Sequence, residues 1–93
     1  MTRPTNRFLN EEGLVVQWPS RPVDREAVCA YLADKFAPGH SYTEAEVNEL
    51  LKLWHTFGDW SLLRRELYER RFLDRDPAGR DYRRTSKPAE SAR

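Results

Sequence analysis

The basic side chains that could bind phosphate are the residues of this sequence with the most evident chemistry. Residues 59–93 hold ten Lys and Arg against seven Asp and Glu, a net charge of +3, whereas residues 1–58 hold six against eight, a net charge of −2. A local excess of positive charge attracts the phosphates of nucleic acids, although the excess here is modest. The charge distribution therefore favours a nucleic-acid-binding surface in the C-terminal part of the chain.

The candidate DNA-binding residues lie on a predicted helix and on the hairpin that follows it. They are polar or basic side chains on the displayed sides of these two elements: Ser61, Arg64, Arg65, Tyr68, Arg75, Arg80, Arg83 and Arg84. Arginines on a helix can reach guanine edges or phosphates in the major groove, and arginines on a hairpin can clamp phosphates or enter the minor groove. These residues predict a reader of double-stranded DNA.

A second interpretation of the same arginines is that they only solvate the surface. Arg65 can pair with Glu69, and Glu66 with Arg70, at the spacing that stabilises a helix without any ligand. Arg75 can brace the hairpin internally. Three acids dilute the positive charge of the hairpin: Asp74, Asp76 and Asp81. For Arg64 and Arg65 the sequence supports the two interpretations about equally, whereas for any single arginine of the hairpin it slightly favours the second.

Other kinds of chemistry have little support in the sequence. Cys29 is the only cysteine, so it cannot form an internal disulfide, and it lies beside an apolar stripe. His40 and His55 are separated by a predicted helix and lack the closely spaced partners of a zinc site. Ser61 has no recognisable His and Asp partners, and no glycine-rich phosphate loop is present. We expect no enzymatic activity, metal, cofactor or small-molecule substrate.

The helix that carries Arg64 and Arg65 is predicted to begin at Asp59, whose carboxylate can accept hydrogen bonds from the free amides of the first turn. An apolar stripe at three- and four-residue spacing predicts its buried side: Trp60, Leu63 and Leu67. The four residues 76–79, Asp-Pro-Ala-Gly, predict a hairpin loop after this helix. If Arg75 and Arg80 flank the loop, Leu73 lies opposite Tyr82.

The preceding residues predict the elements that support this helix and hairpin. A strand over residues 14–18, part of an N-terminal hairpin, is expected to bury one face: Leu14, Val16 and Trp18. A first helix is expected from about Pro22 to Phe36, with an apolar side: Val28, Tyr31, Leu32 and Phe36. A second begins with a capping box of Thr43 and Glu46, continues to about His55, and has its own apolar side: Val47, Leu50, Leu51 and Trp54.

These elements predict one α+β domain with the order of a winged helix-turn-helix: an N-terminal β-hairpin, three helices and a C-terminal wing hairpin. We place it at residues 7–84, between disordered segments at 1–6 and 85–93. The mean hydropathy of −0.87 and the lack of an apolar stretch of about 18 residues argue against a membrane location. The first ten residues lack the apolar core of a signal peptide, so we expect a cytoplasmic protein.

The second half of the chain resembles the bacterial DUF2087 family. The resemblance is carried by YTEAEVNELL, which begins at Tyr42, and by HTFGDWSLLRRELYERRFLDRDPAGRDYRR, which begins at His55, and it extends to roughly residues 7–84. Members of the family occur alone or joined to bacterial regulator-type helix-turn-helix domains, which implies a regulatory setting. Where this chain has Arg71 the family often has a small residue, so we expect a less tightly turned helix exit here.

Two functions are consistent with the sequence. One is a DNA-binding, transcription-associated regulator in which the third helix reads DNA and the hairpin acts as the wing. The other is a protein-interaction module, with a homodimer as one form, in which Trp54, Phe57 or Trp60 contributes contact area and the arginines only aid solubility. The near-neutral total charge of +1 favours the second function.

Overall fold

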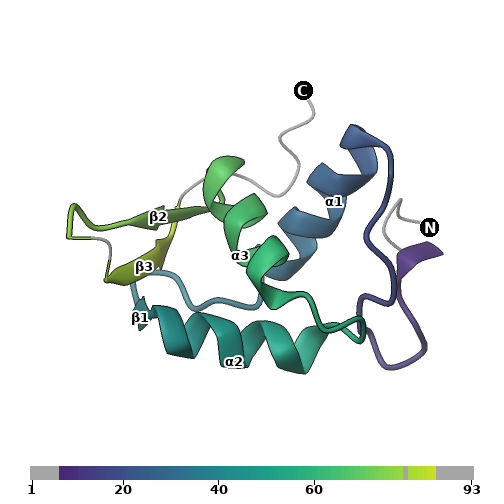
Figure 1. Cartoon of the computed structure of the whole chain (residues 1–93), viewed down its shortest axis with the longest axis horizontal. Coiled ribbons are helices and arrows are strands. Elements are labelled where there is room, and N and C mark those ends of the chain that lie inside the picture. The colour runs from purple at the N-terminus through teal and green to yellow at the C-terminus, as the bar shows by residue number, and fades with distance from the viewer. Residues whose placement is uncertain (1–6, 79, 86–93) are drawn as a thin grey trace.

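A computed structural model of the chain describes residues 7–78 and 80–85, which form three helices and three strands (Figure 1). In chain order the elements are α1 (Pro22–Ala33), β1 (Ser41–Thr43), α2 (Glu44–Trp54), α3 (Trp60–Glu69), β2 (Leu73–Arg75) and β3 (Asp81–Arg84). The strands form one antiparallel sheet in the order β1-β3-β2. The predicted α+β class, the three helices and the C-terminal hairpin are confirmed. The hairpin of β2 and β3 projects from one end of the molecule, and the N-terminal segment lies at the other (Figure 1).

The starts of α2 and α3 are formed by the capping residues that the sequence predicts. The Thr43 hydroxyl accepts from the Glu46 amide at 3.1 Å, and the Glu46 carboxylate accepts from the Thr43 amide at 2.9 Å. Asp59 accepts from the Leu62 amide at 3.2 Å. Each capping bond satisfies an amide that has no partner within its helix, so these side chains determine where α2 and α3 begin.

The first helix is shorter than predicted. It begins at Pro22 but ends at Ala33, three residues before Phe36. Beyond it, the Lys35 amide donates to the Leu32 carbonyl and the Phe36 amide donates to the Ala33 carbonyl, at 3.0 and 3.1 Å. These three-residue steps tighten the chain into a turn that still brings the Phe36 ring into the core, where it is 1% exposed.

The hydrophobic core lies where the three helices meet one another and the hairpin. Its fully buried residues come from all of these elements: Val28 and Leu32 of α1, Val47 and Leu51 of α2, Leu63 and Leu67 of α3, and Leu73 of β2. Burying a large aliphatic side chain stabilises a fold by about 1.5–3 kcal/mol. Because α3 packs its apolar stripe into this core, its opposite side faces outward.

The predicted N-terminal β-hairpin is present only as a chain reversal with one antiparallel bridge, without the predicted strand. Residues 14–18 form no strand, and the segment makes only two isolated bridges, Leu9 with Val15 and Val15 with His55. The second bridge is parallel and joins the segment to the end of α2. The N-terminal segment therefore packs along the connection between α2 and α3 and does not form a separate small sheet.

The predicted inward face of this segment is also wrong. Val15 is fully buried, whereas Val16, expected to face the core, is 39% exposed. Val15 donates its amide to the Trp54 carbonyl at 2.8 Å, and its carbonyl accepts from the Thr56 amide at 3.0 Å. These bonds to the α2–α3 connection set which side chain faces inward, and a shift of one residue reverses the two faces of an extended chain.

The pairing of β2 with β3 also differs from the prediction. Arg75 lies opposite Tyr82 and Leu73 opposite Arg84, so the predicted pairing of Leu73 with Tyr82 is wrong. The loop is closed by Asp76, whose amide donates to the Asp81 carbonyl at 3.0 Å.

The Asp76 side chain explains the longer loop. Its carboxylate accepts from the Arg80 amide at 2.9 Å and the Asp81 amide at 3.4 Å, which places Arg80 inside the loop. An aspartate that bonds to backbone amides a few residues ahead stabilises a turn of this kind. Gly79, predicted to reverse the chain here, lies outside the described residues.

The exit of α3 is tightly turned, contrary to the expectation from the arginine at position 71. Arg71 adopts a positive φ of 70°, its amide donates to the Tyr68 carbonyl at 3.0 Å, and the Phe72 amide donates to the Leu67 carbonyl at 2.8 Å. These bonds form a Schellman motif, in which a glycine usually occupies the position of Arg71. The motif aims the chain from the end of α3 directly into β2.

The disorder predicted for residues 1–6 and for 86–93 concerns positions outside the described residues. Thr85, which the sequence assigns to the same C-terminal tail, still bonds to the fold. Its amide donates to the Phe72 carbonyl at 3.0 Å, and its hydroxyl donates to the Arg71 carbonyl at 2.7 Å. Thr85 therefore holds the end of β3 against the exit of α3.

Candidate nucleic-acid interface

The outward side of α3 presents a row of polar side chains. Ser61, Arg65, Tyr68 and Glu69 are all exposed, and their spacing of three and four residues places them on one face. Within the part of the chain that the structure describes, Arg65 makes no hydrogen bond or ion pair. Its guanidinium is therefore available to a ligand.

The hairpin joins this row through Tyr68 and Arg75. The Arg75 guanidinium lies over the Tyr68 ring, 4.7 Å from its centroid. Interaction with the Tyr82 hydroxyl raises the pKa of Arg75 above its usual range. Arg75 is thus both exposed and braced, as one interpretation of the sequence expects, and it connects the displayed side of α3 to β2 and β3.

Arg64 points in a different direction from Arg65. Its guanidinium donates a hydrogen bond to the side-chain oxygen of Asn48 and lies 3.7 Å from the Glu44 carboxylate, both on α2. The Arg64 side chain is 21% exposed. Arg64 therefore holds α2 against α3. Its neighbour Arg65, in contrast, is exposed and makes no such contact within the described residues.

Of the remaining hairpin arginines, two are exposed on the surface and one bonds to the rest of the fold. Arg80 is exposed in the loop, and Arg83 is exposed with its guanidinium donating to the Ser41 hydroxyl at 3.0 Å. Arg84 turns toward the end of α1, where it donates to the Phe36 carbonyl at 2.9 Å and the Asp34 carboxylate at 3.2 Å. Arg80 and Arg83 remain on the outer surface, whereas Arg84 fastens β3 to α1.

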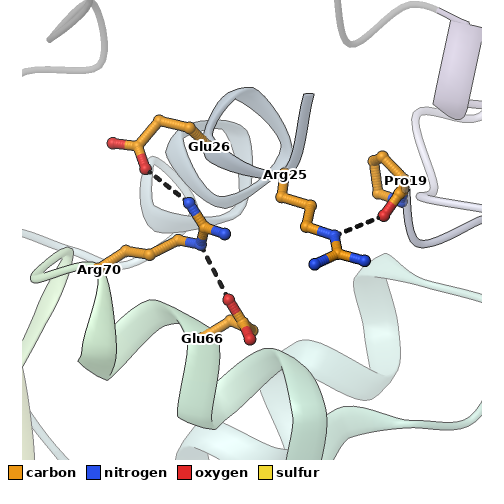
Figure 2. A network of polar contacts seen from close by, with 5 residues as sticks. All are labelled: Pro19, Arg25, Glu26, Glu66 and Arg70. Carbon is orange, nitrogen blue, oxygen red and sulfur yellow. Dashed lines mark hydrogen bonds and ion pairs between the residues drawn. The ribbon is translucent and has the colours of Figure 1, made fainter. Parts of the chain in front are cut away.

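A separate network on the other side of α3 joins it to α1 (Figure 2). Arg70 donates to Glu66 of α3 at 2.8 Å and to Glu26 of α1 at 3.1 Å. Burial opposes the charge of Arg70, but the hydrogen bonds to Glu66 and Glu26 outweigh it and raise the pKa of Arg70. The sequence predicts the Glu66 pair. It gives no signal for Glu26, because this partner is distant in sequence.

The structure leaves six of the eight predicted site residues on the outer surface of α3 and the hairpin, with Arg83 on the other face of the hairpin from Arg75. Arg65 and Tyr68 lie on the helix, Tyr68 contacts Arg75, and Arg80 and Arg83 are exposed on the same hairpin. Ser61 begins the row on α3. Arg64 and Arg84 are directed toward α2 and α1.

A shallow hollow lies beside this surface, between the end of α3 and β2. It has a volume of about 400 Å³ and is lined by Tyr68, Glu69, Arg71, Leu73, Asp74 and Thr85. Its acidic side chains, Glu69 and Asp74, were not among the predicted site residues. The spacing of Glu69 from Arg65 was the signal that could have identified it, because both fall on the same helical face.

The two histidines and the cysteine pack against or bond to other residues of the fold. The His55 imidazole is buried, and its Nδ1 donates to the Leu51 carbonyl at 2.6 Å. His40 packs its ring against Tyr42, with centroids 4.5 Å apart. Cys29 is buried in the core. Over residues 7–78 and 80–85, no group of three or more His, Cys, Asp or Glu side chains is placed to hold a metal ion.

Comparison with known proteins agrees with the sequence resemblance. A family model described as an uncharacterized protein conserved in bacteria, DUF2087, matches residues 14–84. This match covers most of the chain, and the chain belongs to that family. No match was found among curated proteins or among solved structures. In the described part of the chain, no helix has the length and apolar character needed to cross a membrane.

Proposed function

We propose that this protein is a winged-helix module that binds double-stranded DNA and acts in transcriptional regulation. In this proposal α3 enters the major groove, and the hairpin of β2 and β3 is the wing that contacts the flanking backbone. The contacting side chains are those that remain on the outer surface: Ser61, Arg65, Tyr68, Arg75, Arg80 and Arg83. Arg64 and Arg84 support the interface from behind by holding α2 and α1.

The order of the elements supports this proposal. A helix-turn-helix pair, α2 and α3, is followed by a hairpin, and a strand before α2 completes the sheet beside that hairpin. In helix-turn-helix proteins the second helix of the pair is the one that lies in the groove. The corresponding helix here is α3, whose outward side carries polar side chains only.

The observation that carries the proposal is the contact of Arg75 with Tyr68. Because the guanidinium lies 4.7 Å from the ring centroid, the helix and the hairpin present one surface with positive charge on both parts. Arginine is suited to both DNA contacts, because its planar fork donates to phosphate oxygens and to guanine. A surface that only aids solubility does not require the hairpin to be fixed relative to the helix.

Fluorescence anisotropy with a random-sequence duplex at low salt tests the proposal. The wild-type protein is expected to bind, and Arg65→Ala is expected to bind several-fold more weakly. Arg21→Ala is the matched control, because it removes one exposed arginine at the start of α1, away from the interface. Absence of binding by the wild type, or equal losses for both variants, would contradict the proposal.

A second candidate function is a protein-interaction module, which is favoured by the exposure of Leu53. This side chain, next to the last residue of α2, is 70% exposed. Trp54 and Phe57 are half-buried nearby in the sequence, and Trp60 is half-buried under Lys52, whose ammonium is 4.4 Å from the ring centroid. Sedimentation of the wild type and of Leu53→Ser at high concentration tests for a homodimer. A homodimer that uses Leu53 should be weakened in the variant, and a wild type that is strictly monomeric would exclude a homodimer.

A further inference from the structure

Arg65 and Glu69 are unpaired although their spacing would allow an ion pair. They lie four residues apart on the exposed side of α3, where an arginine and a glutamate commonly interact. No ion pair or hydrogen bond joins the two side chains, and neither side chain has another such partner among residues 7–78 and 80–85. Both charged groups therefore remain free on the surface that the proposed function assigns to DNA.

The neighbouring glutamate of α3 shows the contrast. Glu66 bonds to Arg70 at 2.8 Å and is 17% exposed, so it has an evident role in joining α3 to α1. Glu69 makes no comparable contribution to the fold. On a surface that binds phosphates, an unpaired carboxylate lowers affinity for every sequence by repulsion. Its position in the row therefore has to be explained by something other than phosphate attraction.

Base recognition explains a carboxylate at this position. In the major groove a glutamate accepts a hydrogen bond from the N4 amino group of cytosine, and an arginine donates two to O6 and N7 of guanine. Four residues along a helix correspond to a rise of about 6 Å. Successive base pairs are about 3.4 Å apart, so the two side chains can reach bases one or two steps apart.

We propose that Arg65 and Glu69 determine the base preference of the interface, with Arg65 contacting a guanine and Glu69 contacting a cytosine one or two steps away. This inference rests on the proposed function, because it assigns specificity within the same DNA-binding surface. Arg65 provides affinity and preference together, whereas Glu69 provides preference alone. The exposed arginines of the hairpin, Arg80 and Arg83, bind the backbone whatever the sequence.

Selection from a pool of duplexes with a randomised central segment tests this assignment. The wild type is expected to enrich duplexes that carry a guanine and a cytosine at a fixed spacing. In Glu69→Gln the base preferred at this position is expected to change from cytosine to adenine, because glutamine bonds to N6 and N7 of adenine. Adenine should then be enriched over cytosine by about tenfold. The substitution should leave the guanine preference unchanged. Glu69→Ala should lose the preference at that position and keep or increase total binding.

The matched control is Glu12→Gln, which makes the same change of charge at an exposed position of the N-terminal segment. It should enrich the same duplexes as the wild type. Binding by the wild type with the same preference in Glu69→Gln and Glu69→Ala would overturn the assignment and leave the DNA-binding function intact. Absence of any duplex binding by the wild type at low salt would overturn both. Circular dichroism of each variant verifies that α3 is unchanged.

Discussion

The guanidinium of Arg64 on α3 donates a hydrogen bond to the side-chain oxygen of Asn48 on α2. The two residues are 16 positions apart, and their contact fixes α2 and α3 relative to each other. Arg65, the next residue, has no such partner in the described part of the chain. Arg64 therefore supports the fold, whereas Arg65 is the arginine that the proposed function assigns to DNA.

Replacing Arg64 tests its supporting role. Arg64→Ala should lower the free energy of unfolding by about 1 kcal/mol, because Asn48 loses its hydrogen bond while the more exposed Glu44 adds little. Arg65→Ala should change it by less than about 0.5 kcal/mol, as expected for a surface residue without contacts. Urea unfolding measures both. Equal stability of the two variants would contradict the separation of roles.

The positive φ of Arg71 predicts a stabilising substitution. Arg71→Gly should raise the free energy of unfolding by about 1 kcal/mol, because glycine adopts the left-handed conformation without strain from a Cβ. Arg71→Ala is the control, since it removes the guanidinium but keeps the Cβ, and no gain is expected. Thermal unfolding compares the three proteins. A gain in Arg71→Ala as large as that in Arg71→Gly would assign the effect to charge.

Gly13 and Gly39 allow the cost of backbone strain to be measured separately from the cost of a steric clash. Gly13 and Gly39 have φ of +83° and +77°, but a Cβ on Gly13 would lie 3.0 Å from the Tyr31 hydroxyl, whereas one on Gly39 would meet no atom within 4 Å. Gly39→Ala should cost about 1 kcal/mol of stability from backbone strain alone. Gly13→Ala should cost roughly 1 kcal/mol more, because the clash also disturbs the bond from Tyr31 to the Gly13 carbonyl.

A double-mutant cycle with Tyr31→Phe completes this test. Once the hydroxyl has been removed, Gly13→Ala should cost about the same as Gly39→Ala, since only the backbone strain remains. Additive effects of Gly13→Ala and Tyr31→Phe would show that the clash does not contribute.

The contact between α1 and α3 depends on Arg70 (Figure 2). Arg70→Ala should lower the free energy of unfolding by about 1–2 kcal/mol, because it leaves the largely buried Glu66 without a partner. Because the pKa of Arg70 is raised, the charge and its contribution persist at every pH below the arginine range and are lost only as pH rises through it. The loss should thus be the same at pH 6 and pH 8.

Arg70→Lys provides the control for this prediction. It keeps the charge but cannot reach both carboxylates with a planar fork, so its stability should lie between those of the wild type and Arg70→Ala. Urea unfolding at the two pH values measures the series. A loss confined to one of the two pH values would contradict the role assigned to Arg70.

The features that follow from neighbours in sequence could be predicted. Thr43 with Glu46, and Asp59 with the amides after it, act within one helical turn, so their types and spacing determine the helix starts. The apolar spacing of Leu63 and Leu67 likewise determines which side of α3 is buried. The outward position of Arg65 follows from the same spacing.

The features that depend on distant partners could not be predicted. Val15 is buried because its backbone bonds to the α2–α3 connection, about 40 residues away, and alternation within its own segment gives no indication of this. The direction of Arg64 depends on Asn48, and the direction of Arg84 on Phe36 and Asp34. Helical spacing identifies these arginines as candidates, but only their partners show which of them are free.

The salt dependence of DNA binding tests the central claim most directly. Affinity for one duplex is measured by fluorescence anisotropy between 50 and 200 mM salt, and log K is plotted against log salt concentration for the wild type, Arg80→Ala and Arg64→Ala. A phosphate contact by Arg80 that releases one counterion predicts that Arg80→Ala reduces the slope by about 0.9, whereas Arg64→Ala weakens binding with an unchanged slope. Wild-type binding that is absent or independent of salt, or an equal slope for the wild type and Arg80→Ala, would contradict this account.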